Sequence, residues 1–121
     1  MNTRDVVRGF YEGLARQDDS WQQNLSDEVA FTDASSKLQA RGRPAFIQSF
    51  GAFLRAVVKV ELKHLIVEGS DAAAVVSYEY TNPKGEQLHQ DDAEVWRVEG
   101  GEIVALTIYF DITEFRSFMG R

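Results

Sequence analysis

Residues 87–111 decide the fold of this chain, and they read QLHQDDAEVWRVEGGEIVALTIYFD. Apolar residues alternate with polar or charged residues before Gly100-Gly101, a pair that favours a tight turn, and β-branched and aromatic residues are frequent after it. This alternation has the period of a β-strand, and the short connection indicates antiparallel neighbours. Together with the same pattern upstream, it predicts four strands: Lys59 to Glu68, Ala72 to Tyr80, Gln87 to Val98 and Glu102 to Asp111.

The part of the chain before these strands has mainly a helical period. Apolar residues at i, i+4 spacing predict a helix from Thr3 to Gln17, with Thr3 as its cap. A second long helix begins at Pro44, since proline is accepted in a first helical turn. The other expected segments are a short turn or helix near Ser20, a strand from Val29 to Asp33, and a tail from Thr113 to Gly120 that is either a short helix or an ordered arm.

Helices followed by an antiparallel meander are the element order of an α+β domain, in which the helices pack on one face of a curved sheet. The curvature leaves a cavity between the helices and the sheet. The 121 residues have the length of one domain, 1–121, and 44% apolar residues are enough to bury one core. We therefore expect a single domain with one pocket.

The composition argues against several classes of function. A net charge of −6 repels phosphate backbones, and no stretch groups Lys and Arg among aromatic residues, so we expect no nucleic-acid partner. The chain contains no Cys, begins without an apolar signal core, and has no apolar run near the ~20 residues that cross a bilayer. We therefore expect a cytoplasmic protein with no membrane contact.

The histidines give little support for a metal site. His64 and His89 do not have the spacing of zinc ligands. His89 with Asp91 and Asp92 is the one conceivable metal group, and a solvated loop edge explains these residues better. We expect neither a metal ion nor a cofactor.

The strand expected from Gln87 to Val98 brings acidic and apolar side chains to one face. Asp92 and Glu94 alternate in phase with Trp96, so all three point the same way. An ionised carboxylate in an apolar pocket is costly unless it is paired or protonated. Two alternatives follow: the carboxylates lie in an apolar pocket and are functional, or the strand is open to water and both are solvated.

Four segments resemble the nuclear transport factor two-like superfamily, and more narrowly its SnoaL-like and ketosteroid isomerase-like branches. They are FYEGLARQD at 10–18, AFTD at 30–33, GRPAFIQSF at 42–50 and EIVALTIYFD at 102–111. The resemblance implies a cone-shaped, curved, antiparallel or mixed sheet wrapped around the N-terminal helices, with one central pocket. The superfamily includes isomerases, cyclases, hydratases, epoxide hydrolases and non-enzymatic binding domains, so the fold does not choose among these functions.

The resemblance also implies roles for individual residues. Asp33 matches the general-base aspartate of ketosteroid isomerases, and Glu94 falls at or beside their protonated, oxyanion-binding aspartate. Phe10 matches their oxyanion-binding tyrosine and lacks its hydroxyl. Tyr11 is adjacent but about 100° around the helix, so we do not expect it to substitute. The alternative for Asp33 is a turn-forming aspartate that accepts hydrogen bonds from nearby backbone amides.

Other residues are expected around the pocket or on the outer face of the sheet. Asp111 caps the tail or edges the pocket, and capping is preferred. The outer face is expected to form a twofold homodimer, as it commonly does in the resembling families; its apolar residues are Val75, Ala93, Val95, Ile103, Ala105 and Tyr109. The residues expected to contact a ligand, with core packing as the alternative, are Phe10, Leu14, Phe50, Tyr78, Asp92, Trp96, Ile108 and Phe110.

These inferences lead to two hypotheses of function. The first is a cofactor-independent isomerase or cyclase that acts on a small hydrophobic carbonyl compound by proton transfer, with Asp33 as the base and a neutral Glu94 as the hydrogen-bond donor. The second is a non-catalytic ligand-binding or association domain, in which both carboxylates serve the structure.

Overall fold

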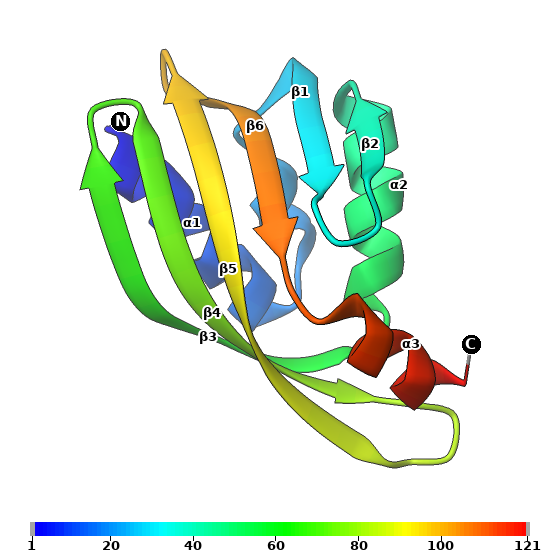
Figure 1. The fold of residues 1–121 in the computed structure, drawn as a ribbon. Helices are drawn as coiled ribbons and strands as arrows, with labels where there is room; N and C mark the ends of the chain where they lie inside the picture. Colours follow the sequence, from blue (N-terminus) through cyan, green and yellow to red (C-terminus); the bar gives the residue numbers. More distant parts are fainter. Residues whose placement is uncertain (1, 121) are drawn as a thin grey trace.

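A computed structural model describes residues 2–120 of the chain. It has three α-helices, one short 3-10 helix and six strands (Figure 1). In chain order these are α1 Thr3–Arg16, η1 Asp19–Gln22, β1 Leu25–Asp33, β2 Leu38–Arg41, α2 Arg43–Leu54, β3 Val57–Glu68, β4 Asp71–Thr81, β5 Gln87–Glu99, β6 Glu102–Tyr109 and α3 Ile112–Met119.

Local sequence determines where the helices begin. The cap of α1 is Asn2, whose side chain accepts a hydrogen bond from the backbone N–H of Asp5, so the prediction of Thr3 was wrong by one position. Pro44 lies in the first turn of α2, as expected. The tail forms α3, and Asp111 caps it by accepting from the backbone N–H of Glu114 at 2.9 Å.

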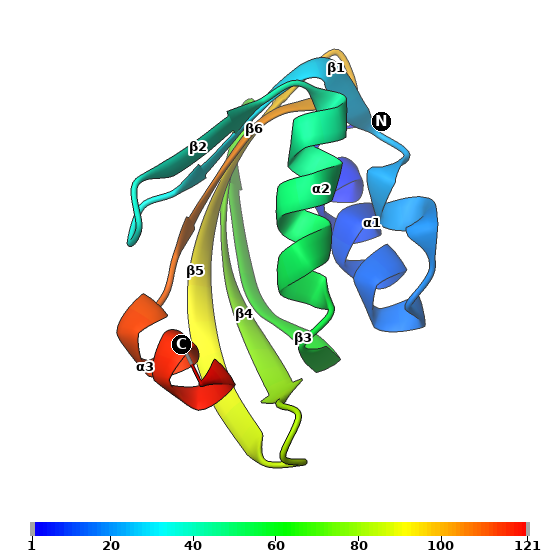
Figure 2. The ribbon, with the colours of Figure 1, turned by 90° about the vertical axis from the view of Figure 1, so that its right-hand side faces the viewer.

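The strands form one mixed sheet in the order β2-β1-β6-β5-β4-β3. The β3–β6 meander is antiparallel, whereas β1 pairs with β6 in parallel. Figure 2 shows that the sheet curves and that α1 and α2 lie together on its concave face. Among residues 2–120 the edge strands β2 and β3 do not pair with each other, so the fold is an open α+β cone and not a closed barrel. The sequence analysis missed β2.

The core is mainly aromatic and lies between the concave face of the sheet and the two long helices. The ring centroid of Phe10 on α1 lies 4.6 Å from that of Trp96 on β5 and 5.4 Å from that of Phe50 on α2. Such edge and tilted contacts add to the free energy of burial. One assignment to the outer face was wrong: Ile103 is fully buried, because the register of β5 and β6 shifts by one residue after Arg97.

Candidate functional site

The carboxylate of Glu94 lies at the centre of a buried hydrogen-bond network. Tyr11 from α1 donates its hydroxyl to Oε1 at 2.5 Å, and Tyr78 from β4 donates to Oε2 at 2.8 Å. The indole N–H of Trp96 in turn donates to the Tyr11 hydroxyl at 2.9 Å. Glu94 itself is fully buried, so these three side chains satisfy a group that water does not reach.

The network controls the protonation of Glu94. Burial raises the pKa of Glu94 from 4.5 to about 7, because the charged form loses its hydration. The hydrogen bonds from Tyr11 and Tyr78 act in the opposite direction, since they stabilise the carboxylate. Burial also raises the pKa of both tyrosines well above the ordinary value, and the charge of Glu94 adds to this, so both remain donors.

Asp92, two residues earlier on the same face of β5, has no such support. Its side chain is 1% exposed, and neither carboxylate oxygen has a hydrogen-bond partner among the described residues. Burial, followed by the charge of Glu94, raises the pKa of Asp92 to about 8. Asp92 is therefore the member of the pair whose environment favours the protonated form more strongly. We call Asp92 and Glu94 the acid pair.

Two more buried polar atoms without partners accompany Asp92. They are the hydroxyl of Tyr80 and the side-chain carbonyl oxygen of Gln90. Gln90 lies two residues before Asp92 on the same inward face of β5. The pKa of Tyr80 is raised by burial and then by the charge of Asp92, so its hydroxyl also keeps its proton. The alternative that water solvates both carboxylates of the acid pair was wrong, because both side chains are buried. Native interiors seldom contain such groups without a role or a bound water.

Asp33 ends β1, as predicted, and its carboxylate is used in a turn. It accepts from the backbone N–H of Ser35 at 3.0 Å and from the Ser36 hydroxyl at 2.9 Å. These bonds are the turn-forming alternative of the sequence analysis. Asp33 also lines a cavity of about 490 Å³ between the ends of β1, β6, α2 and α3. We call this space the end cavity; its walls include Phe31, Asp33, Phe53, Ile108, Phe110 and Phe115.

Phe53 lines the end cavity and packs against β4 and the end of β6. Its ring lines the cavity and lies 5.2 Å from that of Tyr78 on β4 and 6.0 Å from that of Phe110 after β6. Tyr78 pairs with Gln90 of β5 in the register of the sheet, so Phe53 packs on the strand next to the one that carries the acid pair.

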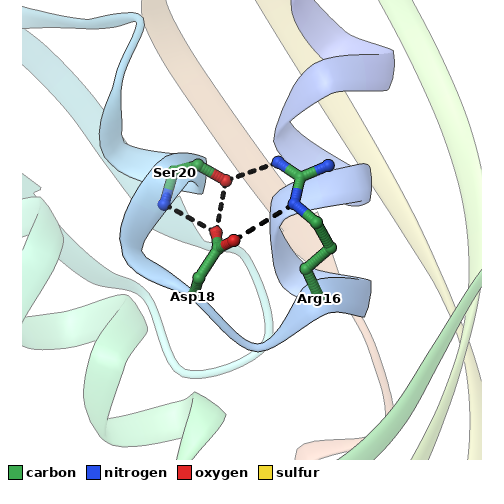
Figure 3. Close-up of polar contacts among 3 residues, drawn as sticks. All are labelled: Arg16, Asp18 and Ser20. Carbon is green, nitrogen blue, oxygen red and sulfur yellow. Dashed lines mark hydrogen bonds and ion pairs between the residues drawn. The ribbon is translucent and has the colours of Figure 1, made fainter.

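The structure divides the residues expected to contact a ligand into three groups. Ile108 and Phe110 line the end cavity. Leu14 lies instead beside a second hollow between α1, α2 and β3. On the rim of that hollow, Arg16 donates to Asp18 at 3.1 Å and to the Ser20 hydroxyl at 2.7 Å, an exposed contact that fixes the turn after α1 (Figure 3). The remaining residues lie in the core and its polar network: Phe10, Phe50, Tyr78, Asp92 and Trp96.

Tyr11 is the residue that the sequence reasoning misplaced. Its position about 100° from Phe10 led us to exclude it, yet its hydroxyl contacts Glu94 directly. The buried stripe of α1 is wide enough to hold both rings, with Val7 and Leu14 beside Tyr11 at helical spacing. A phenol in a buried stripe needs a polar partner, and that requirement was the available signal.

No metal site is found in residues 2–120, where no group of three or more His or acidic side chains could hold an ion. The conceivable group around His89 is split by the strand: His89 contacts the Asp91 carboxylate at 3.2 Å on the outer face, while Asp92 points inward. It lies within β5 and not at a loop edge. None of the helices in the described part of the chain is long and apolar enough to span a membrane.

Solved structures share this architecture. An NTF2-like protein of unknown function from Burkholderia pseudomallei superimposes with a TM-score of 0.85 at 22% identity, over 100% of this chain and 99% of that chain. TerC, co-crystallised with polyporic acid, gives 0.85 at 13% identity over 98% of both chains. An epoxide hydrolase/cyclase-like enzyme of pyran ring formation in salinomycin gives 0.82 at 20% identity over 92% of both. At these identities the likeness shows the fold alone.

The sequence comparison gives the family. No curated protein sequence matches the chain. Residues 7–106, which include most of α1, the acid pair and most of β6, match the family of SnoaL-like domains. The chain belongs to the SnoaL-like domain family.

Proposed function

We propose that this protein is a cofactor-independent isomerase or cyclase that acts on a small hydrophobic carbonyl compound by proton transfer. The observation that carries the proposal is the buried, unpartnered carboxyl of Asp92 beside Glu94. When two carboxyl groups have different surroundings, their pKa values differ. In enzymes one member of such a pair then acts as an acid, and the other acts as a base or as a stabilising charge. The cyclase-like neighbour in salinomycin formation supports this class of chemistry.

Asp92 takes the role of the acid in this proposal. Its raised pKa favours the protonated form, and neither of its oxygens has a partner among the described residues, so its O–H is free to donate to a carbonyl oxygen. Both oxygens of Glu94 accept from tyrosine hydroxyls, so we assign Glu94 the role of a positioning residue whose ionised form raises the pKa of Asp92. The donor role that the sequence analysis gave to Glu94 thus moves two residues along the strand.

Asp33 remains the proposed base. It lines the end cavity, and its charge is close enough to contribute to the raised pKa of Asp92. The proton on the carbon next to the carbonyl moves to Asp33, and the C–H electron pair forms the enolate double bond. Asp92 donates its proton to the carbonyl oxygen, which gives the enol, and takes this proton back when the carbonyl reforms. Delivery of the proton on Asp33 to a conjugated carbon of the enol gives an isomer. Attack of the enol carbon on an electrophilic carbonyl within the same molecule closes a ring, and the proton on Asp33 then goes to the oxygen of that carbonyl.

Phe53 controls access in this scheme. The substrate enters the end cavity from outside, and its carbonyl reaches Asp92 when the Phe53 ring turns aside. The closed ring keeps water from the acid pair, which maintains the low polarity that keeps Asp92 protonated.

The test uses 2-tetralone, a neutral two-ring ketone, in D₂O, with NMR to follow exchange of the protons next to its carbonyl. The wild-type protein is expected to speed exchange over buffer, and Asp33→Asn and Asp92→Asn are expected to lose most of this acceleration. Asp27→Asn changes an exposed aspartate on the same strand as Asp33 and is the matched control. Equal exchange in Asp92→Asn and wild type would remove Asp92 as the acid.

A binding domain without turnover is the second candidate. The observation in its favour is the turn around Asp33, in which Ser35 and Ser36 occupy both carboxylate oxygens. If this candidate is right, 2-tetralone binds saturably in a titration while its exchange rate stays at the buffer value.

We also propose a homodimer through the outer face of the sheet. Figure 2 shows that α1 and α2 cover only the concave face. On the uncovered face Val95 is 43% exposed and Tyr109 is 49% exposed, and Ala93 lies exposed beside them in the register of β5 and β6. A second copy of the chain placed across a twofold axis would cover these apolar side chains.

A further inference from the structure

Two arginines with free guanidinium groups stand at the end cavity. Arg55 follows α2 and Arg116 lies in α3, and both line the cavity while remaining exposed. Within residues 2–120 neither forms an ion pair or a side-chain hydrogen bond, whereas Arg16 and Arg97 are paired with carboxylates and Arg43 donates to a backbone carbonyl. In a chain with a net charge of −6, two free arginines at one opening form a local positive site.

Asp33 and Asn82, two other polar residues of the end cavity, already have hydrogen-bond partners. Asp33 accepts from Ser35 and Ser36 and forms no ion pair with either arginine. The Asn82 amide donates to the Glu86 carboxylate and to the backbone carbonyl of Phe118, and its oxygen accepts from backbone amides. The arginines are the cationic groups of the cavity lining, and neither is paired with a carboxylate of the described residues.

Behind the arginines, the wall of the end cavity is apolar. Phe31, Phe53, Ile108, Phe110 and Phe115 supply most of it, and Met119 lies nearby in α3. A volume of about 490 Å³ is in the range of cavities that hold small organic ligands. This arrangement matches a molecule with an apolar ring system at one end and an acidic group at the other.

We propose that the substrate class is an apolar carbonyl compound with a carboxylate, whose charge is bound by Arg55 and Arg116 while its ring system fills the end cavity. The carbonyl group of this substrate class rests on the proposed function, whereas the carboxylate and the ring system are inferred from the end cavity. The buried acids do not reverse the preferred charge, because both arginines line the end cavity whereas Asp92 and Glu94 do not. A guanidinium is also suited to carboxylates, since it offers parallel N–H donors.

The experiment compares three probes of nearly equal shape by calorimetric titration: naphthalene-2-acetate, its neutral amide and 2-(2-naphthyl)ethylamine. The acetate is expected to bind at least about fivefold more tightly than the amide, and the ammonium probe most weakly. Arg55→Gln and Arg116→Gln are each expected to reduce the preference for the acetate, and the double variant to remove it. Since both arginines are exposed, these variants should keep the wild-type melting temperature. Arg8→Gln, an exposed arginine of α1 away from the cavity, is expected to keep the full preference.

Four results would overturn the inference: no binding of any probe, equal affinity for acetate and amide, tightest binding of the ammonium probe, or an unchanged preference in the double variant. The preference should also weaken between low and high salt, since exposed charges are screened. The titration needs no turnover. Failure of 2-tetralone exchange would therefore reject the proton-transfer chemistry alone, and loss of the acetate preference would reject the substrate class alone.

Discussion

Replacement of Asp92 by asparagine is expected to change how the stability of the protein depends on pH. In the folded state, burial and then the charge of Glu94 raise the pKa of Asp92 from 3.8 to about 8. The folded protein therefore keeps this proton between about pH 4 and pH 8, where the unfolded chain has released it. The stability from this group is present below the unfolded pKa and is lost as the pH rises through the folded pKa.

The size of the loss in the free energy of unfolding follows from the shift in the pKa of Asp92. Each pH unit in this window is worth about 1.4 kcal/mol, so the wild-type free energy of unfolding should fall by about 3 kcal/mol between about pH 5.5 and pH 8.5 because of Asp92. Asparagine has nearly the same volume and does not ionise. The Asp92→Asn variant should therefore lack this part of the decline and should be the more stable protein at the higher pH.

Urea unfolding followed by tryptophan fluorescence measures both free energies at each pH. Asp27→Asn, on the exposed side of β1, should show the wild-type pH dependence and is the control. Equal pH dependence in wild type and Asp92→Asn would refute the reasoning, because it would mean that Asp92 titrates in the folded protein as it does in the unfolded chain.

Three further predictions concern stability and assembly. Tyr78→Phe removes a bond to the buried carboxylate and should lower the free energy of unfolding by about 1–3 kcal/mol, whereas the exposed Tyr109→Phe should change it little; equal losses would contradict the network. Gly13→Ala should destabilise the protein, since the added Cβ would lie 2.6 Å from a backbone nitrogen of η1. Gly51→Ala, where the added Cβ meets open space, should stabilise the protein by about 0.5–1 kcal/mol. A melting temperature below that of the wild type for Gly13→Ala and above it for Gly51→Ala would agree with both expectations. Val95→Glu should shift the sedimentation coefficient from dimer to monomer, and a monomeric wild type would reject the proposed interface.

The sequence predicted the fold well where the side-chain period is simple. The strict alternation from Leu88 to Val98 placed Asp92, Glu94 and Trp96 on one face, and the structure confirms that this face is buried. The helix from Pro44 and the cap at Asp111 were also confirmed, because their signals are local to the chain.

The remaining differences come from contacts that no local pattern contains. β2 has four residues, and none of them is buried, so its sequence has no apolar alternation that would predict a strand. It is a strand because it pairs with β1 through backbone hydrogen bonds. Ile103 faces inward because β6 shifts register against β5. Tyr11 joins Glu94 across 83 positions of sequence, a contact that depends on how α1 lies across the sheet.

The parallel pairing of β1 with β6 has a consequence for the order of folding. Phe31 lies opposite Leu106 and Asp33 opposite Ile108, so the pairing joins residues 75 positions apart, whereas β3 to β6 join through short turns. Local hairpins close faster than such long loops, so the meander should form first and receive β1 late. Asp33 and Ile108 line the end cavity at this junction. During synthesis the cavity would thus be completed only after the ribosome has released β6, and a chain arrested before that point would have hairpins but no binding site.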